Sequence, residues 1–240
     1  MAGSDGMLRA ALAYARLGWP VFPCRPGEKV PATRRGFLDA CTDPGRIAAW
    51  WTSVPGRNVA IATGEPGPDV VDVDVRAGGS GFAAFGRLRR EGLAGDPGVV
   101  VRTPSGGMHA YYAGTGQRSG HLGAHHLDFR SQGGYVLAPP SAVGGRPYVA
   151  VRRRAGAVVF DWGRARDLLD PRPAPEPGTS GRAGREVDPR HLAGWVAAQP
   201  EGNRNAGLFW AASRVIKAGR GDALDGLARA AQAAGLTARR

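Results

Sequence analysis

The stretch VVDVDV, residues 70–75, sets two acidic residues into a run of valines. The valines are typical of a buried strand, and side chains alternate along a strand, so Asp72 and Asp74 are expected on one face with Cα atoms roughly 6.5–7 Å apart. Burying two unpaired carboxylates together is costly. A divalent cation would remove that cost, because carboxylate oxygens suit Mg²⁺ and Mn²⁺. The stretch alone leaves open an alternative, an edge strand whose outer face carries two hydrated acids.

A second motif, RTPSGGMHAYY at residues 102–112, places a Ser-Gly-Gly turn between two predicted strands. Gly106 and Gly107 allow backbone N–H groups to approach a ligand closely, and Ser105 adds a hydroxyl group. His109 begins the next strand. A hydroxyl, an imidazole and a glycine turn together suit a phosphate group, although an ordinary hairpin turn beside an exposed histidine has the same pattern.

A third motif, LDFRSQGGYVLAPPS at residues 127–141, places Asp128 and Arg130 on one face of a strand. The Gly133-Gly134 pair predicts a tight turn into an apolar strand. Asp128 is a candidate third carboxylate for a metal site, and Arg130 is a candidate for neutralising phosphate. A plain ion pair between the two side chains is the alternative.

The hydrophobic periodicity along the chain predicts an α+β fold. Helices are expected at residues 7–17, 42–51, 79–92 and 161–169. Strands are expected at residues 19–24, 58–64, 69–75, 98–104, 108–114, 126–130, 134–140 and, as an edge strand, 147–154.

The composition changes sharply after residue 170, which predicts a first domain over residues 1–170. Residues 171–186 are rich in Pro, Gly and Ser and are expected to be a linker. A small helical module is expected over residues 187–240, with one helix around Trp195 and others at 203–218 and 222–234. Its ending, GLTARR, leaves open whether the module is complete.

The net charge of +12, carried mostly by arginine, indicates an anionic partner, with nucleic acid as the first candidate. A basic surface of this kind would hold the backbone of a DNA template without reading its sequence. Lys29, Arg34 and Arg35 in an early loop are candidates for that surface, or simply residues of a hydrated loop. A coding bias that favours arginine is the alternative explanation of the charge.

Several classes of protein do not fit the sequence. The two cysteines, Cys24 and Cys41, lack the spacing of metal ligands and suggest no disulfide framework. Arg16 interrupts the first apolar stretch, so no secretory signal is predicted, and no apolar run reaches about twenty residues. We therefore expect a cytoplasmic protein without a membrane span.

Taken in order, DVDV, PSGGMHAYY and LDFRSQGGYVLAPPS resemble the motifs of the bifunctional primase–polymerase (prim-pol) domain of the archaeo-eukaryotic primase superfamily. The upstream segments at residues 18–51 and 58–64 also resemble the start of that domain, so the resemblance covers roughly residues 8–170. It implies a catalytic domain with a core related to the RNA-recognition fold. It also implies template-directed nucleotidyl transfer from nucleoside triphosphates, by a DNA primase or polymerase that serves a plasmid, a phage or an integrated element.

The resemblance also implies roles for individual residues. Two divalent ions, Mg²⁺ or Mn²⁺, would be held by Asp72, Asp74 and Asp128, one ion activating the primer 3′-hydroxyl and the other holding the triphosphate. The nucleotide would be bound by Ser105, Gly106, Gly107, His109 and Arg130. The catalytic set is then Asp72, Asp74, His109 and Asp128.

The partners follow from the same resemblance: a single-stranded DNA template, a primer–template and nucleoside triphosphates. Some family members carry a zinc-binding stem, but His121, His125 and His126 have no cysteine companions, so we expect no zinc site and leave de novo priming open. No helicase phosphate loop occurs, so a helicase is expected on a separate chain.

Two other functions remain open at this stage. A catalytically silent nucleic-acid-binding replication module would keep the fold without the chemistry. A metal-dependent nuclease or rolling-circle initiator would need a nucleophilic tyrosine and a His-hydrophobic-His pair, and HLGAHH at residues 121–126 lacks that spacing.

Overall fold

The structure is a computed structural model that describes residues 3–171, 188–198, 204–233 and 235. The chain divides into two compact units, Met1–Arg172 and Pro173–Arg240, and each is described by itself. Of the expected linker at 171–186, only residue 171 is among the described residues.

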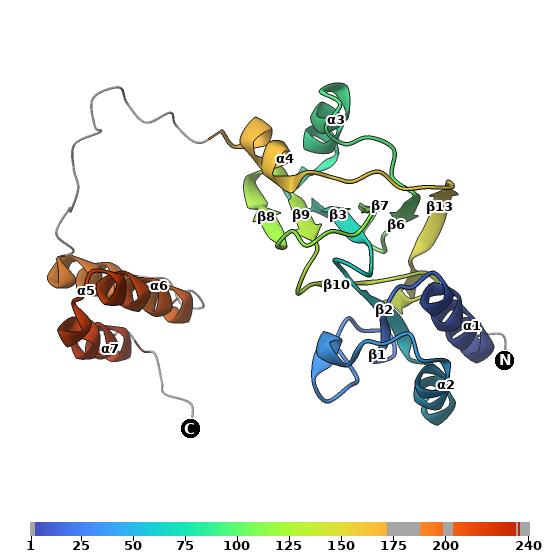
Figure 1. The fold of residues 1–240 in the computed structure, drawn as a ribbon, viewed down its shortest axis with the longest axis horizontal. Coiled ribbons are helices and arrows are strands. Elements are labelled where there is room, and N and C mark those ends of the chain that lie inside the picture. The colour runs from blue at the N-terminus through green and yellow to red at the C-terminus, as the bar shows by residue number, and fades with distance from the viewer. Residues whose placement is uncertain (1–2, 172–187, 199–203, 234, 236–240) are drawn as a thin grey trace. The chain divides into compact units, whose positions relative to one another are not determined.

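The first unit is organised by a six-stranded antiparallel sheet with the strand order β13-β6-β7-β3-β9-β8 (Figure 1). Its strands, in chain order, are β3 (Asp69–Val73), β6 (Val99–Arg102), β7 (Met108–Tyr112), β8 (Gly120–Leu122), β9 (Leu127–Arg130) and β13 (Val149–Arg153). The acidic stretch of the sequence thus supplies an inner strand, β3, and the predicted edge strand at 147–154 is confirmed as β13. The α+β prediction is confirmed at the level of a mixed fold with this antiparallel sheet.

One face of the sheet is covered by α3 (Phe82–Arg90) and α4 (Trp162–Leu169). Val71 and Val73 of β3 belong to the hydrophobic core on this side, together with Phe85 of α3 and Trp162 of α4. Both valines are fully buried, which explains why this half of the alternating pattern is strictly apolar.

The opposite face of the sheet meets a second core. Here Val70 and Tyr111 pack with a three-stranded sheet of order β1-β2-β10, and with two helices. These elements are α1 (Gly3–Arg16), β1 (Val21–Cys24), α2 (Pro44–Ser53), β2 (Asn58–Ala62) and β10 (Tyr135–Leu137). Asp43 caps α2 by accepting a hydrogen bond from the Arg46 backbone N–H at 2.6 Å.

The second unit contains α5 (Pro189–Ala197), α6 (Arg204–Lys217) and α7 (Leu224–Ala233), close to the three predicted helices. Their apolar faces share one small core, formed by Leu192, Val196, Ala211, Val215, Leu227 and Ala231. Among the described residues of the whole chain, no helix has the length and apolar character needed to cross a membrane.

Three local predictions were wrong or incomplete. β3 ends at Val73 instead of continuing to Val75, because the chain turns into a short hairpin of β4 (Val75–Arg76) and β5 (Gly79–Ser80). Two short elements were not predicted: β8, and a hairpin of β11 (Ala142–Val143) and β12 (Arg146–Pro147). Strands of two or three residues are too short to show a period in the sequence.

A buried acid at the start of β3 fastens two neighbouring loops. Asp69 accepts hydrogen bonds from the hydroxyl groups of Ser131, at 2.6 Å, and Thr115, at 2.5 Å. Burial raises the pKa of Asp69, and the two hydroxyl donors oppose that shift. The Asp69 carboxyl group therefore has a structural role. Its hydrogen bonds come from neutral hydroxyl groups, Ser131 beyond the end of β9 and Thr115 beyond the end of β7.

We predict that Asp69→Ala lowers the free energy of unfolding by about 1–3 kcal/mol, because the buried Ser131 hydroxyl and the half-buried Thr115 hydroxyl lose this acceptor. Asp167→Ala, on the exposed side of α4, is the matched control and should change stability by less than about 0.5 kcal/mol. Urea denaturation at neutral pH measures both. Equal stability of the two variants would show that the Asp69 network contributes nothing.

Candidate active site

A row of polar side chains crosses the central sheet. In the strand register, His109 of β7 lies opposite Asp72 of β3, and Asp72 lies opposite Asp128 of β9. His121 of β8 extends the row, because it lies opposite Asp128. Residues directly opposite each other in a sheet share a face, so the four side chains project to the same side. They lie on the face away from α3 and α4.

Asp72 stands in the middle of this row. Burial raises its pKa to about 7, and the negative charges of Asp74 and Asp128 add to the increase, while Lys29 and Arg130 oppose it. The pKa shift is large because two like charges and a poorly hydrated position act in the same direction. The sequence predicts that Asp72 and Asp74 repel each other, and the negative charge of Asp74 does raise the pKa of Asp72.

His109 is almost completely buried beside Asp72. Its Nε2 atom is 3.5 Å from Asp72 Oδ1, and its Nδ1 atom has no hydrogen-bond partner in the described part of the chain. Burial lowers the pKa of His109 to about 3, and the nearby cations Lys29 and Arg130 lower it further. The ring is thus neutral at physiological pH, so we regard the contact with Asp72 as that of a neutral imidazole and not as an ion pair.

Asp128, the third predicted acid, is held by two neighbours. Its carboxylate oxygens contact His121 Nδ1 on one side and the Arg130 guanidinium on the other. The prediction that Asp128 and Arg130 share a strand face is confirmed, and the plain ion pair between them is also present. His121, by contrast, is mostly exposed, with 62% of its side chain accessible.

Asp74 lies one residue beyond the end of β3. Its backbone N–H still donates to the His126 carbonyl oxygen at 3.0 Å, which continues the pairing of β3 toward the segment before β9. Its carboxylate contacts the Arg76 guanidinium in the β4 strand. Asp74 is therefore close enough to raise the pKa of Asp72, but it is held by a different arginine from the one that holds Asp128.

The Ser-Gly-Gly turn joins β6 to β7 at the strand end next to Asp74. Ser105 and Gly106 are exposed, and the Ser105 hydroxyl is 3.1 Å from the Thr103 hydroxyl. Gly106 has φ of +86°, and a Cβ atom at Gly107 would overlap the Val73 carbonyl oxygen. The turn thus packs directly on the last residue of β3. None of its three predicted phosphate-binding residues lines the cavity described next.

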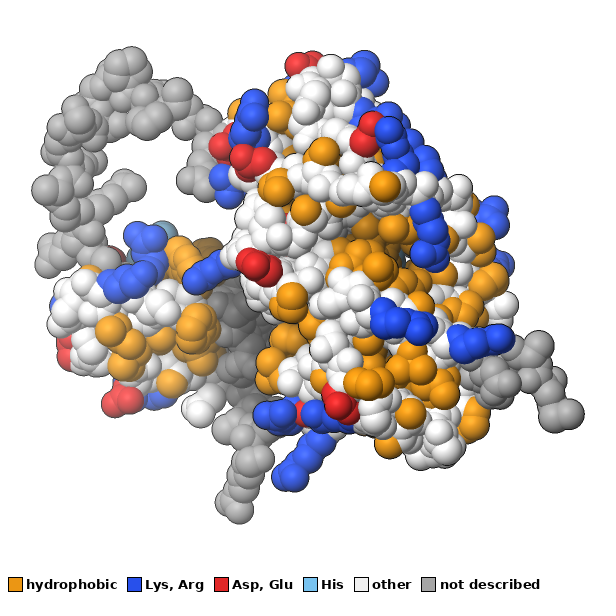
Figure 2. All heavy atoms as spheres, turned by 45° about the vertical axis from the view of Figure 1, so that its right-hand side comes forward, with side chains coloured by type: hydrophobic (Ala, Val, Ile, Leu, Met, Phe, Trp, Pro, Cys, Tyr) orange, Lys and Arg blue, Asp and Glu red, His pale blue; other side chains and the backbone are white. Residues whose placement is uncertain are grey.

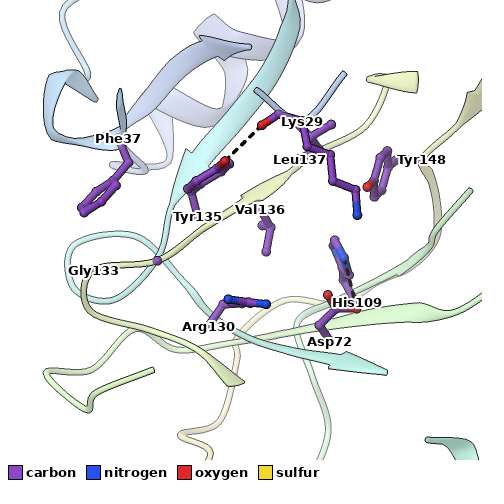
Figure 3. A pocket seen from close by; sticks show the side chains of 11 residues that line it. Lys29, Phe37, Asp72, His109, Arg130, Gly133, Tyr135, Val136, Leu137 and Tyr148 are labelled. Carbon is purple, nitrogen blue, oxygen red and sulfur yellow. Dashed lines mark hydrogen bonds and ion pairs between the residues drawn. The ribbon is translucent and has the colours of Figure 1, made fainter. Parts of the chain in front are cut away.

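A cavity of about 270 Å³ lies over the row, between the large sheet and the small one (Figure 3). Asp72, His109 and Arg130 form one side of it, and Lys29 and Tyr148 stand across from them. The Lys29 side chain extends toward His109 and Tyr148, and Tyr135 donates a hydrogen bond to the Lys29 carbonyl oxygen at 3.0 Å (Figure 3). Two cations and an acid therefore face one polar cavity.

The acids suit a hard divalent cation in kind, but their arrangement is only partly that of a metal site. Asp72 is repelled by two acids, and Lys29 and Arg130 only partly offset the effect of this repulsion on its pKa, whereas Asp74 and Asp128 are each engaged by an arginine. Among the described residues, no group of three or more His, Cys, Asp or Glu side chains is close enough to hold a metal ion. The site fits a cation at Asp72. Asp74 and Asp128 could join as ligands only if each gave up its contact with an arginine.

Sequence reasoning missed the places of three residues at this site. The sequence places Lys29 with Arg34 and Arg35 in one early loop, as candidates for a DNA-binding surface; all three are exposed, and Lys29 also lines the cavity. His121 extends the polar row from β8, a strand of three residues that is too short to be predicted from the sequence. Tyr148 packs on His109 with ring centroids 5.5 Å apart, and no signal in the sequence linked the two.

The comparison with protein families agrees with this geometry. A family model described as "Bifunctional DNA primase/polymerase, N-terminal" matches residues 11–177 of the 240-residue chain. No curated protein matches the chain by sequence. The matched range contains all four residues of the polar row and every residue that lines the cavity, and the resemblance drawn from the three motifs is confirmed. The chain belongs to the bifunctional DNA primase/polymerase N-terminal family.

Proposed function

We propose that this protein catalyses template-directed addition of nucleotides to DNA, as a primase or polymerase in the replication of a plasmid, a phage or an integrated element. Family membership supports nucleotidyl transfer of the primase/polymerase type. The observation that carries the proposal is the row of His109, Asp72 and Asp128. His109 and Asp72 line a cavity whose other charged groups, Lys29 and Arg130, are cations. A triphosphate requires cations, and the chemistry of its transfer requires acids next to them.

The cationic residues and the neutral histidine of the site would have different roles. Lys29 and Arg130 bind the anionic oxygens of the triphosphate, and Arg130 also orients Asp128. The neutral His109 ring, which lines the cavity, donates a hydrogen bond to a phosphate oxygen. The Ser105–Gly107 turn, which lies outside the cavity at the strand end next to Asp74, is assigned to the outer phosphates.

Asp72, Asp74 and Asp128 would hold Mg²⁺ or Mn²⁺, which supplies a Lewis acid for the 3′-hydroxyl and the leaving pyrophosphate. The like charges around Asp72 make its carboxylate a better metal ligand than an isolated acid, because a bound cation relieves the repulsion that otherwise raises its pKa. His121 and Arg130 fix the orientation of Asp128.

The partners in this proposal are a single-stranded template, a primer–template and nucleoside triphosphates, with a helicase on another chain. Metal-dependent primer extension is the test that separates the proposal from its two alternatives. A silent binding module would show no extension. A rolling-circle nuclease would cut the template and would need a reactive tyrosine, whereas Tyr111 and Tyr112 are fully buried and have unpartnered hydroxyl groups within the described structure.

We predict that Asp72→Asn reduces primer extension with Mg²⁺ or Mn²⁺ at least 1,000-fold, because the central ligand loses its charge while the side chain keeps its shape. Asp167→Asn, on the exposed side of α4, is the matched control and should extend primers normally. The measurement is a gel assay of a labelled primer at several metal concentrations. Near-normal extension by Asp72→Asn would refute the metal assignment.

The same substitution should change how stability depends on pH. The pKa of Asp72 rises on folding to about 7, so the folded state holds its proton where the unfolded state has released it. In EDTA, the wild-type protein should therefore lose roughly 1 kcal/mol per pH unit from this group between about pH 4 and pH 7. Asp72→Asn lacks that loss.

The advantage of Asp72→Asn over the wild type should thus be small near pH 4 and largest above pH 7. Denaturant titrations at pH 4.5, 6 and 7.5 measure it. A constant difference across this range would mean that the raised pKa of Asp72 is not a property of the folded protein.

We predict that His109→Ala weakens nucleotide use by about 1.5–3 kcal/mol, which corresponds to a rise of roughly 10- to 150-fold in the apparent KM for the nucleotide. DNA affinity, measured by fluorescence anisotropy, should stay within twofold, because His109 is buried on the cavity side of the sheet. His191→Ala, on the exposed surface of α5, serves as the control. An equal loss of nucleotide and DNA affinity would contradict the assigned role.

A further inference from the structure

A second cavity, of about 220 Å³, lies on the face of the central sheet that α3 covers, where α3 leaves the β6–β13 edge open. Its apolar walls come from all three elements and from β7: Phe85 of α3, Val100 of β6, Met108 of β7 and Val151 of β13. Val151 has 59% of its surface exposed, which is unusual for a large aliphatic side chain on a strand. We refer to this cavity as the edge groove.

The edge groove is bordered by arginines. Arg89 of α3 and Arg152 of β13 line it, and Arg102 of β6 lies opposite Met108 in the strand register. Arg89 and Arg102 have no carboxylate partner among the residues that the structure describes. Asp96, the one acid that pairs with a groove residue in this description, is shared between Arg152, at 3.8 Å, and Arg154, at 2.5 Å.

The positive charge is visible on the molecular surface. Figure 2 turns the β13 side of Figure 1 toward the viewer and shows Lys and Arg side chains gathered beside exposed hydrophobic ones on that face. An apolar hollow with a basic border matches single-stranded DNA, whose unstacked bases are apolar on their faces and whose phosphates are anionic. A duplex would present only its phosphates to such a hollow.

The groove is also connected to the candidate active site through one strand. Met108 and His109 are consecutive in β7, so their side chains point to opposite faces of the sheet, one into the edge groove and the other into the catalytic cavity. The Ser105–Gly107 turn joins β6 to β7 directly before them. The two cavities are therefore separated by the thickness of the sheet at β7.

We infer that the edge groove binds the single-stranded part of the template, with an unstacked base against Val100, Met108 and Val151 and with its phosphates on Arg89 and Arg152. This inference rests on the proposed function, because it gives the template of that reaction a place on the protein. It adds a binding site on the face opposite the catalytic cavity.

The first test measures binding without chemistry. Arg89→Gln/Arg152→Gln in the full chain should bind a fluorescent oligo(dT) about 5- to 25-fold more weakly at 0.1 M salt, since each lost phosphate contact removes a factor of about 5. The slope of log affinity against log salt should fall by about 1.4. Arg16→Gln/Arg164→Gln, which removes the same charge from the exposed surfaces of α1 and α4, is the matched control and should stay within about twofold.

Anisotropy is recorded in EDTA and without nucleotides, so its outcome does not depend on catalysis. Asp72→Asn should bind DNA like the wild type here, and a failure of the proposed function would appear only in primer extension. No loss of affinity in the groove variant, or the same loss in both double variants, would overturn the inference.

The second test examines whether the groove receives a base. The wild-type protein should bind oligo(dT) several-fold more tightly than an abasic oligonucleotide of the same length. Val151→Ser should reduce this ratio toward one, whereas Val159→Ser, an equally exposed valine outside the groove, should leave it unchanged. An unchanged ratio in Val151→Ser would show that the groove takes another occupant, such as a protein, and would refute a base-binding role.

Discussion

The repulsion among acids at the middle of the central sheet is the constraint on which the rest of the site depends. Asp72 lies on an inner strand, with Asp128 directly across from it and Asp74 just beyond the strand end. Such a group is tolerable only where the sheet face stays polar and where cations surround it. Arg76, Arg130 and Lys29 provide that surrounding positive charge.

The two hydrophobic cores follow from the same constraint. β3 is apolar on one face and polar on the other. Val71 and Val73 pack against α3 and α4, and Asp72 faces the cavity. Only Val70, nearer the start of the strand, contributes to the core with the small sheet. The small sheet thus covers part of the polar face and leaves the rest as the wall of a cavity. A strand with this divided role has to lie inside the sheet, where both neighbours supply polar partners.

The sequence predicted the parts of this arrangement that depend on period and on turn chemistry. The strands of the three motifs and the shared face of Asp128 and Arg130 follow from alternation along a strand. It did not predict that β3 ends at Val73, because DVDV continues the alternation past the point where the backbone turns. It also could not place Lys29 or Tyr148, since both reach the cavity from loops whose positions are set by packing far away in the chain.

The close approach of the glycine turn to β3 has a consequence for how this protein tolerates change. Gly107 has no room for a side chain against the Val73 carbonyl oxygen, while its exposed neighbours Ser105 and Gly106 meet no such obstacle. Substitutions in the turn are therefore tolerated only at its tip. At Gly106 they are limited further, because its backbone is in the left-handed region that favours glycine. The constraint at the base of the turn is set by the backbone of β3, so it holds whatever side chains the acidic strand carries.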